Sequence, residues 1–73
     1  MNIKIDVSTF VARPSSNGEV EIYGTSETSE TVRIGLCIDQ SMAERFLEAS
    51  QGWPTLEIPE EKFRSLKRVN GPQ

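Results

Sequence analysis

The spacing of apolar residues changes once along the chain, close to Asp39, and this change constrains the fold more than any other feature. Before Asp39, every second residue is apolar in three separate runs, which is the period of a strand with one buried face. The runs cover residues 3–7, 20–22 and 32–38. After Asp39, apolar residues recur every three or four positions, as in an amphipathic helix. We therefore expect a strand half followed by a helix half.

Two polar connections join the expected strands into an antiparallel meander. Residues 14–18 read Pro-Ser-Ser-Asn-Gly, which is typical of a hairpin turn because Asn and Gly tolerate a positive φ angle. Residues 24–30 hold no apolar side chain and repeat the triplet Thr-Ser-Glu, so we expect a solvated loop there.

The second half of the chain predicts two helices. Ser41 and Glu44 have the spacing of a capping box at the start of the first helix. Residues 53–58 form a loop or a short extended piece, because Pro54 disfavours helical geometry at Trp53. Pro59 is suited to begin a second helix, which ends before residue 71.

These elements predict a single small α+β domain over residues 1–73. Its architecture is a three-stranded antiparallel β-meander followed by two helices packed on the sheet, in the order βββαα. A chain of this length buries only about 60% of the surface that its unfolded form exposes, so it depends on one tight core or on association. The expected core residues are Ile3, Ile5, Val7, Val20, Ile22, Val32, Ile34, Leu36, Ile38, Phe46, Leu47, Trp53 and Phe63.

The side-chain chemistry argues against an enzyme. The 73 residues include no His and one Cys, so a nucleophile lacks its usual base and a Cys/His metal site cannot form. We expect no catalytic residue, no metal and no cofactor. A single Cys and the absence of an apolar run of about 20 residues predict a cytoplasmic protein with no membrane contact.

Phe10 and Cys37 fall on the strand positions opposite to the expected core. With Tyr23 and Gly35 they predict an apolar strip on the second sheet face. Either the terminal helix covers this strip or it is a dimer face, so we expect a monomer or a homodimer. We interpret Cys37 as a small buried apolar side chain, with a reactive thiol as the alternative.

An acidic tract is the clearest candidate binding feature. The net charge of −3 argues against a generally cationic nucleic-acid binder. Between Arg13 and Arg33 the charged residues are all acidic: Glu19, Glu21, Glu27 and Glu30. Strand alternation places Glu19 and Glu21 on the same face as Tyr23, which would serve as an apolar anchor. The tract predicts a surface for a basic partner protein, with ordinary solvated charge as the alternative.

The last expected helix is basic and supports a second hypothesis. It carries Lys62, Arg64, Lys67 and Arg68, of which Arg64, Lys67 and Arg68 are candidate nucleic-acid contacts. Glu60 and Glu61 share its outer face, and cations near a helix C-terminus complement the helix dipole. Direct nucleic-acid binding is therefore the less favoured interpretation.

Three short motifs follow the expected meander: Ser-Met-Ala-Glu-Arg-Phe at 41–46, Gly-Trp at 52–53 and Glu-Glu-Lys-Phe at 60–63. This layout resembles the small acidic phage-encoded anti-CRISPR proteins, particularly those in which a sheet with helices blocks the DNA-binding cleft of a Cas nuclease. The resemblance implies a protein partner, either a Cas nuclease or another basic nucleic-acid-binding protein. For a phage-encoded protein, it also implies a location in the host cytoplasm.

We therefore interpret the chain as a non-enzymatic protein-binding module. The favoured function is a phage or mobile-element inhibitor of a nucleic-acid-handling complex such as a CRISPR nuclease, acting through the acidic sheet edge and loop. One alternative is a small transcriptional or antitoxin-like regulator that contacts nucleic acid through the basic C-terminal helix. Another is an oligomeric accessory subunit.

Overall fold

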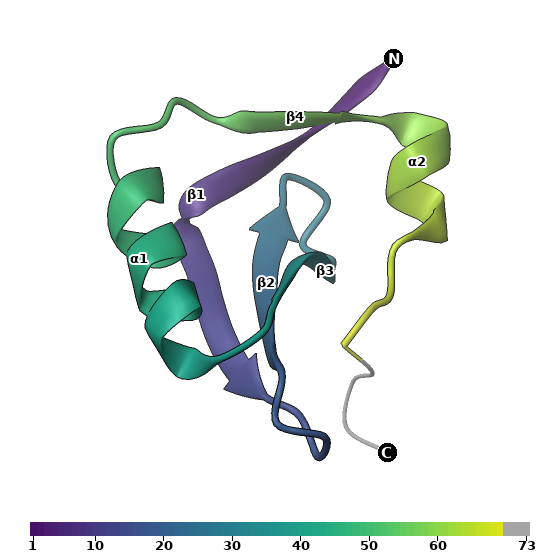
Figure 1. The fold of residues 1–73 in the computed structure, drawn as a ribbon. Coiled ribbons are helices and arrows are strands. Elements are labelled where there is room, and N and C mark those ends of the chain that lie inside the picture. The colour runs from purple at the N-terminus through teal and green to yellow at the C-terminus, as the bar shows by residue number, and fades with distance from the viewer. Residues whose placement is uncertain (70–73) are drawn as a thin grey trace.

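The computed structural model describes residues 1–69. It contains β1 (Asn2–Pro14), β2 (Val20–Ser26), β3 (Thr31–Cys37), α1 (Gln40–Ser50), β4 (Leu56–Pro59) and α2 (Glu60–Ser65) (Figure 1). The strands form one antiparallel sheet in the order β3-β2-β1-β4. The α+β class, the antiparallel sheet and the two helices are confirmed, but the sheet has four strands and not the predicted three. The fourth strand was expected only as a loop or short extended piece.

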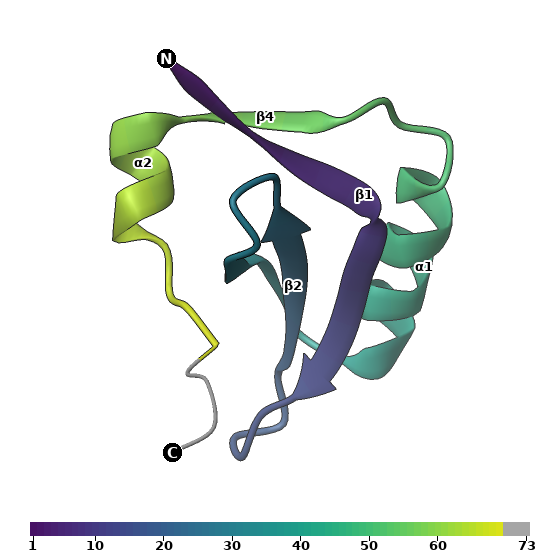
Figure 2. The ribbon, with the colours of Figure 1, turned by 180° about the vertical axis from the view of Figure 1, so that it is seen from behind.

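A break in the middle of β1 makes the sheet curl. The first half of β1 pairs with β4, from Asn2↔Pro59 to Ile5↔Leu56. Strand β2 pairs with β1 at Ile5 and Asp6 and again from Val11 to Pro14. Pairing with β2 is irregular between Asp6 and Val11, and the two halves of β1 run in different directions (Figures 1 and 2). Such irregularities bend a strand and increase its twist. The bend in β1 therefore lets its two neighbours, β2 and β4, run in different directions.

The core consists of two apolar clusters on the side of the sheet that the helices cover. In both views, α1 and α2 lie at opposite ends of the curled sheet (Figures 1 and 2). The cluster beside α1 contains Val20, Ile22, Cys37 and Ala43, with Ala12, Ile34, Phe46 and Leu47 packed against it. The cluster beside α2 contains Ile5, Val32 and Phe63, with Ile3, Phe10, Ile34, Leu56, Ile58 and Leu66 packed against it. Ile34 joins the two clusters.

A bulge in β3 reverses the alternation that the sequence predicts. Ile22 pairs with Gly35, but Tyr23 pairs with Arg33, so Ile34 is an extra residue in β3. Beyond the bulge, Cys37 points into the core while Leu36 is 49% exposed. The prediction that Leu36 and Ile38 are core residues is therefore wrong, since both are exposed. The predicted core position of Trp53 is also wrong, because it lies in an open loop with 42% of its surface exposed.

The N-cap of helix α1 lies two residues before the predicted cap. The carboxylate of Asp39 accepts a hydrogen bond of 2.8 Å from the Met42 amide, which makes Asp39 the N-cap. Ser41, the predicted cap, lies inside the helix.

Helix α2 is shorter than predicted, because the chain leaves it to pair with β3. The backbone becomes extended at Leu66. The Arg33 amide then donates to the Lys67 carbonyl at 2.7 Å, and the Val69 amide donates to the Thr31 carbonyl at 3.0 Å. Lys67 and Arg68 are therefore not on a helix, which corrects the predicted basic helix. These strand-like hydrogen bonds replace the helical ones that the prediction assumed.

Candidate functional site

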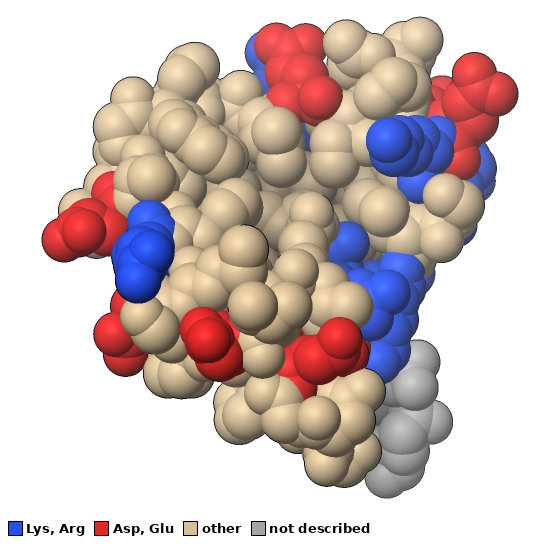
Figure 3. Space-filling view, viewed as in Figure 1, with Lys and Arg blue, Asp and Glu red and all other residues tan. Residues whose placement is uncertain are grey.

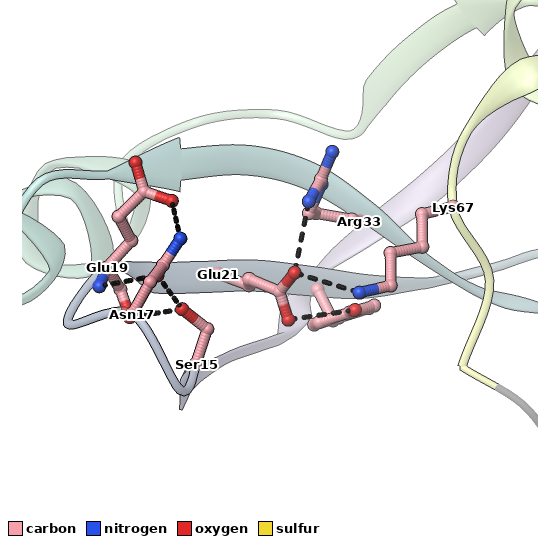
Figure 4. Close-up of polar contacts among 7 residues, drawn as sticks. Ser15, Asn17, Glu19, Glu21, Arg33 and Lys67 are labelled. Carbon is pink, nitrogen blue, oxygen red and sulfur yellow. Dashed lines mark hydrogen bonds and ion pairs between the residues drawn. The ribbon is translucent and has the colours of Figure 1, made fainter.

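The acidic residue at the centre of the predicted binding surface is part of an internal ion-pair network. Glu21 lies between Arg33 and Lys67, with nitrogen–oxygen distances of 3.0 Å and 3.1 Å (Figure 4). The Tyr23 hydroxyl donates to the same carboxylate at 3.1 Å. The hydrogen bond from Lys67 is the main cause that lowers the pKa of Glu21. Its side chain is only 13% exposed, so Glu21 has little surface to offer a partner.

The rest of the predicted basic surface is paired as well. Arg68 donates to Glu30 at 2.9 Å, and Arg64 donates to Glu60 at 2.6 Å. The hydrogen bond from Arg68 lowers the pKa of Glu30. The acidic tract and the basic C-terminal residues were expected to be two separate binding surfaces. Instead, two members of the tract neutralise two of the cations, Lys67 and Arg68.

The other members of the predicted acidic site have local structural roles. Glu19 accepts a hydrogen bond of 3.0 Å from the Asn17 side chain in the β1–β2 turn, where Gly18 adopts a φ of 90° (Figure 4). The carboxylate of Glu27 accepts from the Lys4 amide at 3.0 Å. Tyr23 is only 3% exposed, with the Arg13 guanidinium over its ring. Tyr23 is therefore not an exposed anchor, which corrects that prediction.

The predicted dimer face of Phe10 and Cys37 does not form. Phe10 packs into the cluster beside α2, and Cys37 is buried in the cluster beside α1. Both side chains point to the helix-covered side because the irregularities in β1 and β3 shift the alternation. The interpretation of Cys37 as a small buried apolar side chain is confirmed.

The structure reveals a cleft that the sequence analysis did not predict. It has a volume of about 700 Å³ and lies where the break in β1 meets the end of α1 and the loop that follows it. Its lining residues are Asp6, Val7, Ser8, Phe10, Leu47, Ser50, Gln51, Trp53, Pro54 and Thr55. We call it the Trp53 cleft.

Two aromatic residues that line the Trp53 cleft, Phe10 and Trp53, are joined through Phe46 into a row of three rings. The rings of Phe10 and Phe46 stack with centroids 6.1 Å apart. The Trp53 ring meets Phe46 edge-on at 5.4 Å. The Trp53 amide donates to the Ser50 carbonyl at 3.0 Å, which ties the loop to the end of α1. The indole is thus held in position while 42% of the residue is exposed.

Asp6 provides the charge in the Trp53 cleft. Its neighbour Ile5 pairs with Leu56, so Asp6 comes beside Thr55 at the rim. One carboxylate oxygen, Oδ1, accepts from the Ser8 hydroxyl at 2.8 Å and from the Ser8 amide at 3.0 Å. These hydrogen bonds lower the pKa of Asp6, so the carboxylate is ionised at neutral pH.

A second, shallower groove lies between β3 and α1. It has a volume of about 470 Å³ and is lined by Ile22, Gly35, Leu36, Cys37, Met42, Arg45 and Phe46. Leu36 and Met42 expose about half of their surface here, and Ile38 is exposed close by in the chain. We call this the β3–α1 groove.

Within residues 1–69, no group of three or more His, Cys, Asp or Glu is placed to hold a metal ion. On the face in Figure 3, charged groups of both signs surround a broad uncharged area. Nor does the described part of the chain contain a helix long and apolar enough to span a membrane. Searches of family models, curated proteins and solved structures gave no match for this chain.

Proposed function

We propose that this chain is a non-enzymatic protein-binding module that takes a segment of its partner into the Trp53 cleft. The observation that carries the proposal is the half-exposed Trp53 ring at the end of the aromatic row. Trp is strongly enriched among the residues that dominate binding energy, especially where it borders a preformed pocket. A volume of about 700 Å³ is within the range of ligand-binding clefts.

The ion pairs of the acidic tract change the surface at which we expect a partner to bind. They do not change the proposal that the chain is a protein-binding module. An inhibitor of a nucleic-acid-handling complex, such as a CRISPR nuclease, is one kind of protein-binding module. Pairing of Glu21 with Lys67 and of Glu30 with Arg68 occupies two carboxylates of the acidic tract. We therefore place its partner contact at the Trp53 cleft. The same ion pairs weigh against a regulator that contacts nucleic acid through Lys67 and Arg68.

Selection from a displayed library of random peptides tests the proposal. We expect the immobilised chain to enrich peptides that no longer bind the Trp53→Ala variant. Met42→Ala is the matched control, because Met42 is 48% exposed, similar to Trp53 at 42%, but lies on the β3–α1 groove. Circular dichroism checks that each variant is folded. The proposal fails if no peptide is enriched, or if the enriched peptides bind Trp53→Ala as well as the wild type.

The β3–α1 groove supports a second candidate function, an oligomeric accessory subunit. Leu36 and Met42 are exposed along this groove, and Ile38 is exposed two residues after Leu36 in the chain. A group of exposed apolar side chains is typical of an interface. Sedimentation velocity is then expected to show association that rises with concentration. The double variant Ile38→Ser/Met42→Ser should abolish it. A wild-type chain that stays monomeric at high concentration would remove this candidate.

A further inference from the structure

We propose that the Trp53 cleft recognises a cationic side chain, Arg or Lys, carried by an extended segment of the partner. The cation would lie between the Trp53 ring and the Asp6 carboxylate. This inference rests on the proposed function and specifies the chemistry of the partner.

The charge of the cleft is the first argument. Asp6 is the only charged residue among those that line it. Oxygen Oδ1 is occupied by Ser8, whereas Oδ2 has no hydrogen-bond partner among residues 1–69. Other acidic residues, such as Glu21 and Glu30, are paired with cations of the same chain. An ionised carboxylate with an accepting oxygen at an open cleft is matched by a cationic donor.

The end of helix α1 is the second argument. Ser50 and Gln51 line the cleft at the C-terminus of α1, where the helix dipole places partial negative charge. The last turn of α1 contains no basic residue that would offset this charge. The helix end and the Asp6 carboxylate are both negative, so both favour a positively charged ligand.

The aromatic rings are the third argument. A guanidinium or ammonium group is attracted to the face of an aromatic ring, most strongly to Trp. Two such contacts form within residues 1–69, with Arg13 5.5 Å from the centre of the Tyr23 ring and Arg68 4.9 Å from that of Phe63. Trp53 has no such cation among the described residues, and its ring is partly open to solvent. A cation supplied by a partner would complete the same arrangement.

The apolar part of the cleft favours a peptide over a free cation. Val7, Phe10 and Leu47 line it together with Pro54. A segment with an apolar residue next to its Arg or Lys can cover these side chains while its cation reaches Asp6. An isolated ammonium ion would leave them in contact with water.

The test uses peptides selected on the wild-type chain in the library experiment above. Trp53 is the single Trp of the sequence, so its fluorescence reports binding at the cleft itself. Each peptide is compared with a copy in which Arg is replaced by citrulline, which keeps the shape but removes the charge. We expect the Arg peptide to bind the wild type about tenfold more tightly, as for a hydrogen bond to a charged group. We expect the difference to fall to about twofold or less in Asp6→Asn.

Asp6→Asn keeps the oxygen that accepts from Ser8, so the local turn is retained. Glu19→Gln, in the β1–β2 turn, is the control and should preserve the tenfold difference. The inference is overturned if the selected peptides lack Arg and Lys, if citrulline copies bind equally well, or if Asp6→Asn keeps the preference. It is also overturned if Trp53 fluorescence changes with protein concentration alone, because a second copy of the chain would then occupy the cleft. Peptides that need Trp53 but not Asp6 would leave the proposed function intact.

Discussion

The carboxylate of Glu21 binds two cations and a hydroxyl group that come from separate parts of the chain. Arg33, Lys67 and the Tyr23 hydroxyl all bind its carboxylate, although Lys67 is 46 positions away in the chain. The contacts connect β2, β3 and the segment after α2. A residue that joins three segments in this way contributes to the fold first and is poorly suited to bind a partner.

This role predicts how stability depends on pH. The pKa of Glu21 is lowered from its usual 4.5 in the folded chain, chiefly by Lys67. Its contribution is therefore complete above pH 4.5 and is lost as the pH falls through the folded-state pKa. We expect Glu21→Gln to lower the urea midpoint at pH 7, and the gap from the wild type to shrink at pH 3. Glu48→Gln, on the exposed surface of α1, is the control and should match the wild type at both pH values.

Lys67 should show the opposite dependence. Its pKa is raised from 10.5 by the hydrogen bond to Glu21, so its contribution is present below pH 10.5 and is lost above the raised value. In urea denaturation, Lys67→Gln should be less stable than the wild type at pH 8. Equal midpoints for the two chains at pH 8 would contradict the role assigned to this pair.

Gly24 sets the distance between β1 and β2 at the centre of the core. A Cβ atom at this position would lie 2.8 Å from Ile5 and 2.9 Å from the Phe10 ring, closer than packed atoms approach. We expect Gly24→Ala to destabilise the chain by roughly 1–3 kcal/mol in chemical denaturation. At Gly52 a Cβ would meet nothing within 4 Å, so Gly52→Ala should change stability by less than about 0.5 kcal/mol. Equal effects of the two substitutions would contradict this packing.

At the scale of elements, the sequence predicts the runs that form strands but not the irregularities that orient them. Alternation in β3 is unbroken from Val32 to Ile38, so it carries no sign of the bulge at Ile34. The bulge turns the small residues Gly35 and Cys37 towards α1, where Ala43 packs. This contact joins segments distant in sequence, which local periodicity does not report.

The Trp53 cleft was missed for a related reason. Its walls come from the break in β1, the end of α1 and the loop before β4. Two local signals were available: the polar Asp6, Ser8 and Thr9 near the middle of a strand, and a Trp-Pro pair directly after a helix. Only tertiary packing brings the two together. Likewise, Glu30 and Arg68 are separated by 38 positions, so no local sequence pattern indicates their ion pair.

The bulge in β3 leaves Leu36 exposed, whereas regular strand alternation would bury it. Leu36→Ala should cost less than about 1 kcal/mol, because half of the side chain is already exposed. Ile22→Ala should cost roughly 2–5 kcal/mol, because Ile22 is fully buried. Chemical denaturation of both variants decides between the two orientations. A larger loss of unfolding free energy for Leu36→Ala than for Ile22→Ala would instead support a regular strand without the bulge.

At the scale of the whole molecule, internal charge pairing separates the candidate functions. Arg64, Lys67 and Arg68 each bind a carboxylate of their own chain, so a nucleic-acid phosphate would have to compete for them. We expect no mobility shift of random duplex DNA at low salt. A shift that disappears in Lys67→Gln/Arg68→Gln would favour the regulator instead.

Chemical-shift mapping of a ¹⁵N-labelled chain with a selected peptide tests the central claim most directly, because it locates the contact surface without assuming it. The account predicts that the largest shifts occur at Asp6, Ser8, Gln51 and Trp53, which line the Trp53 cleft. Little change is expected at the acidic tract, Glu19, Glu21, Glu27 and Glu30. Shifts concentrated on the acidic tract, with the Trp53 indole unchanged, would contradict the account.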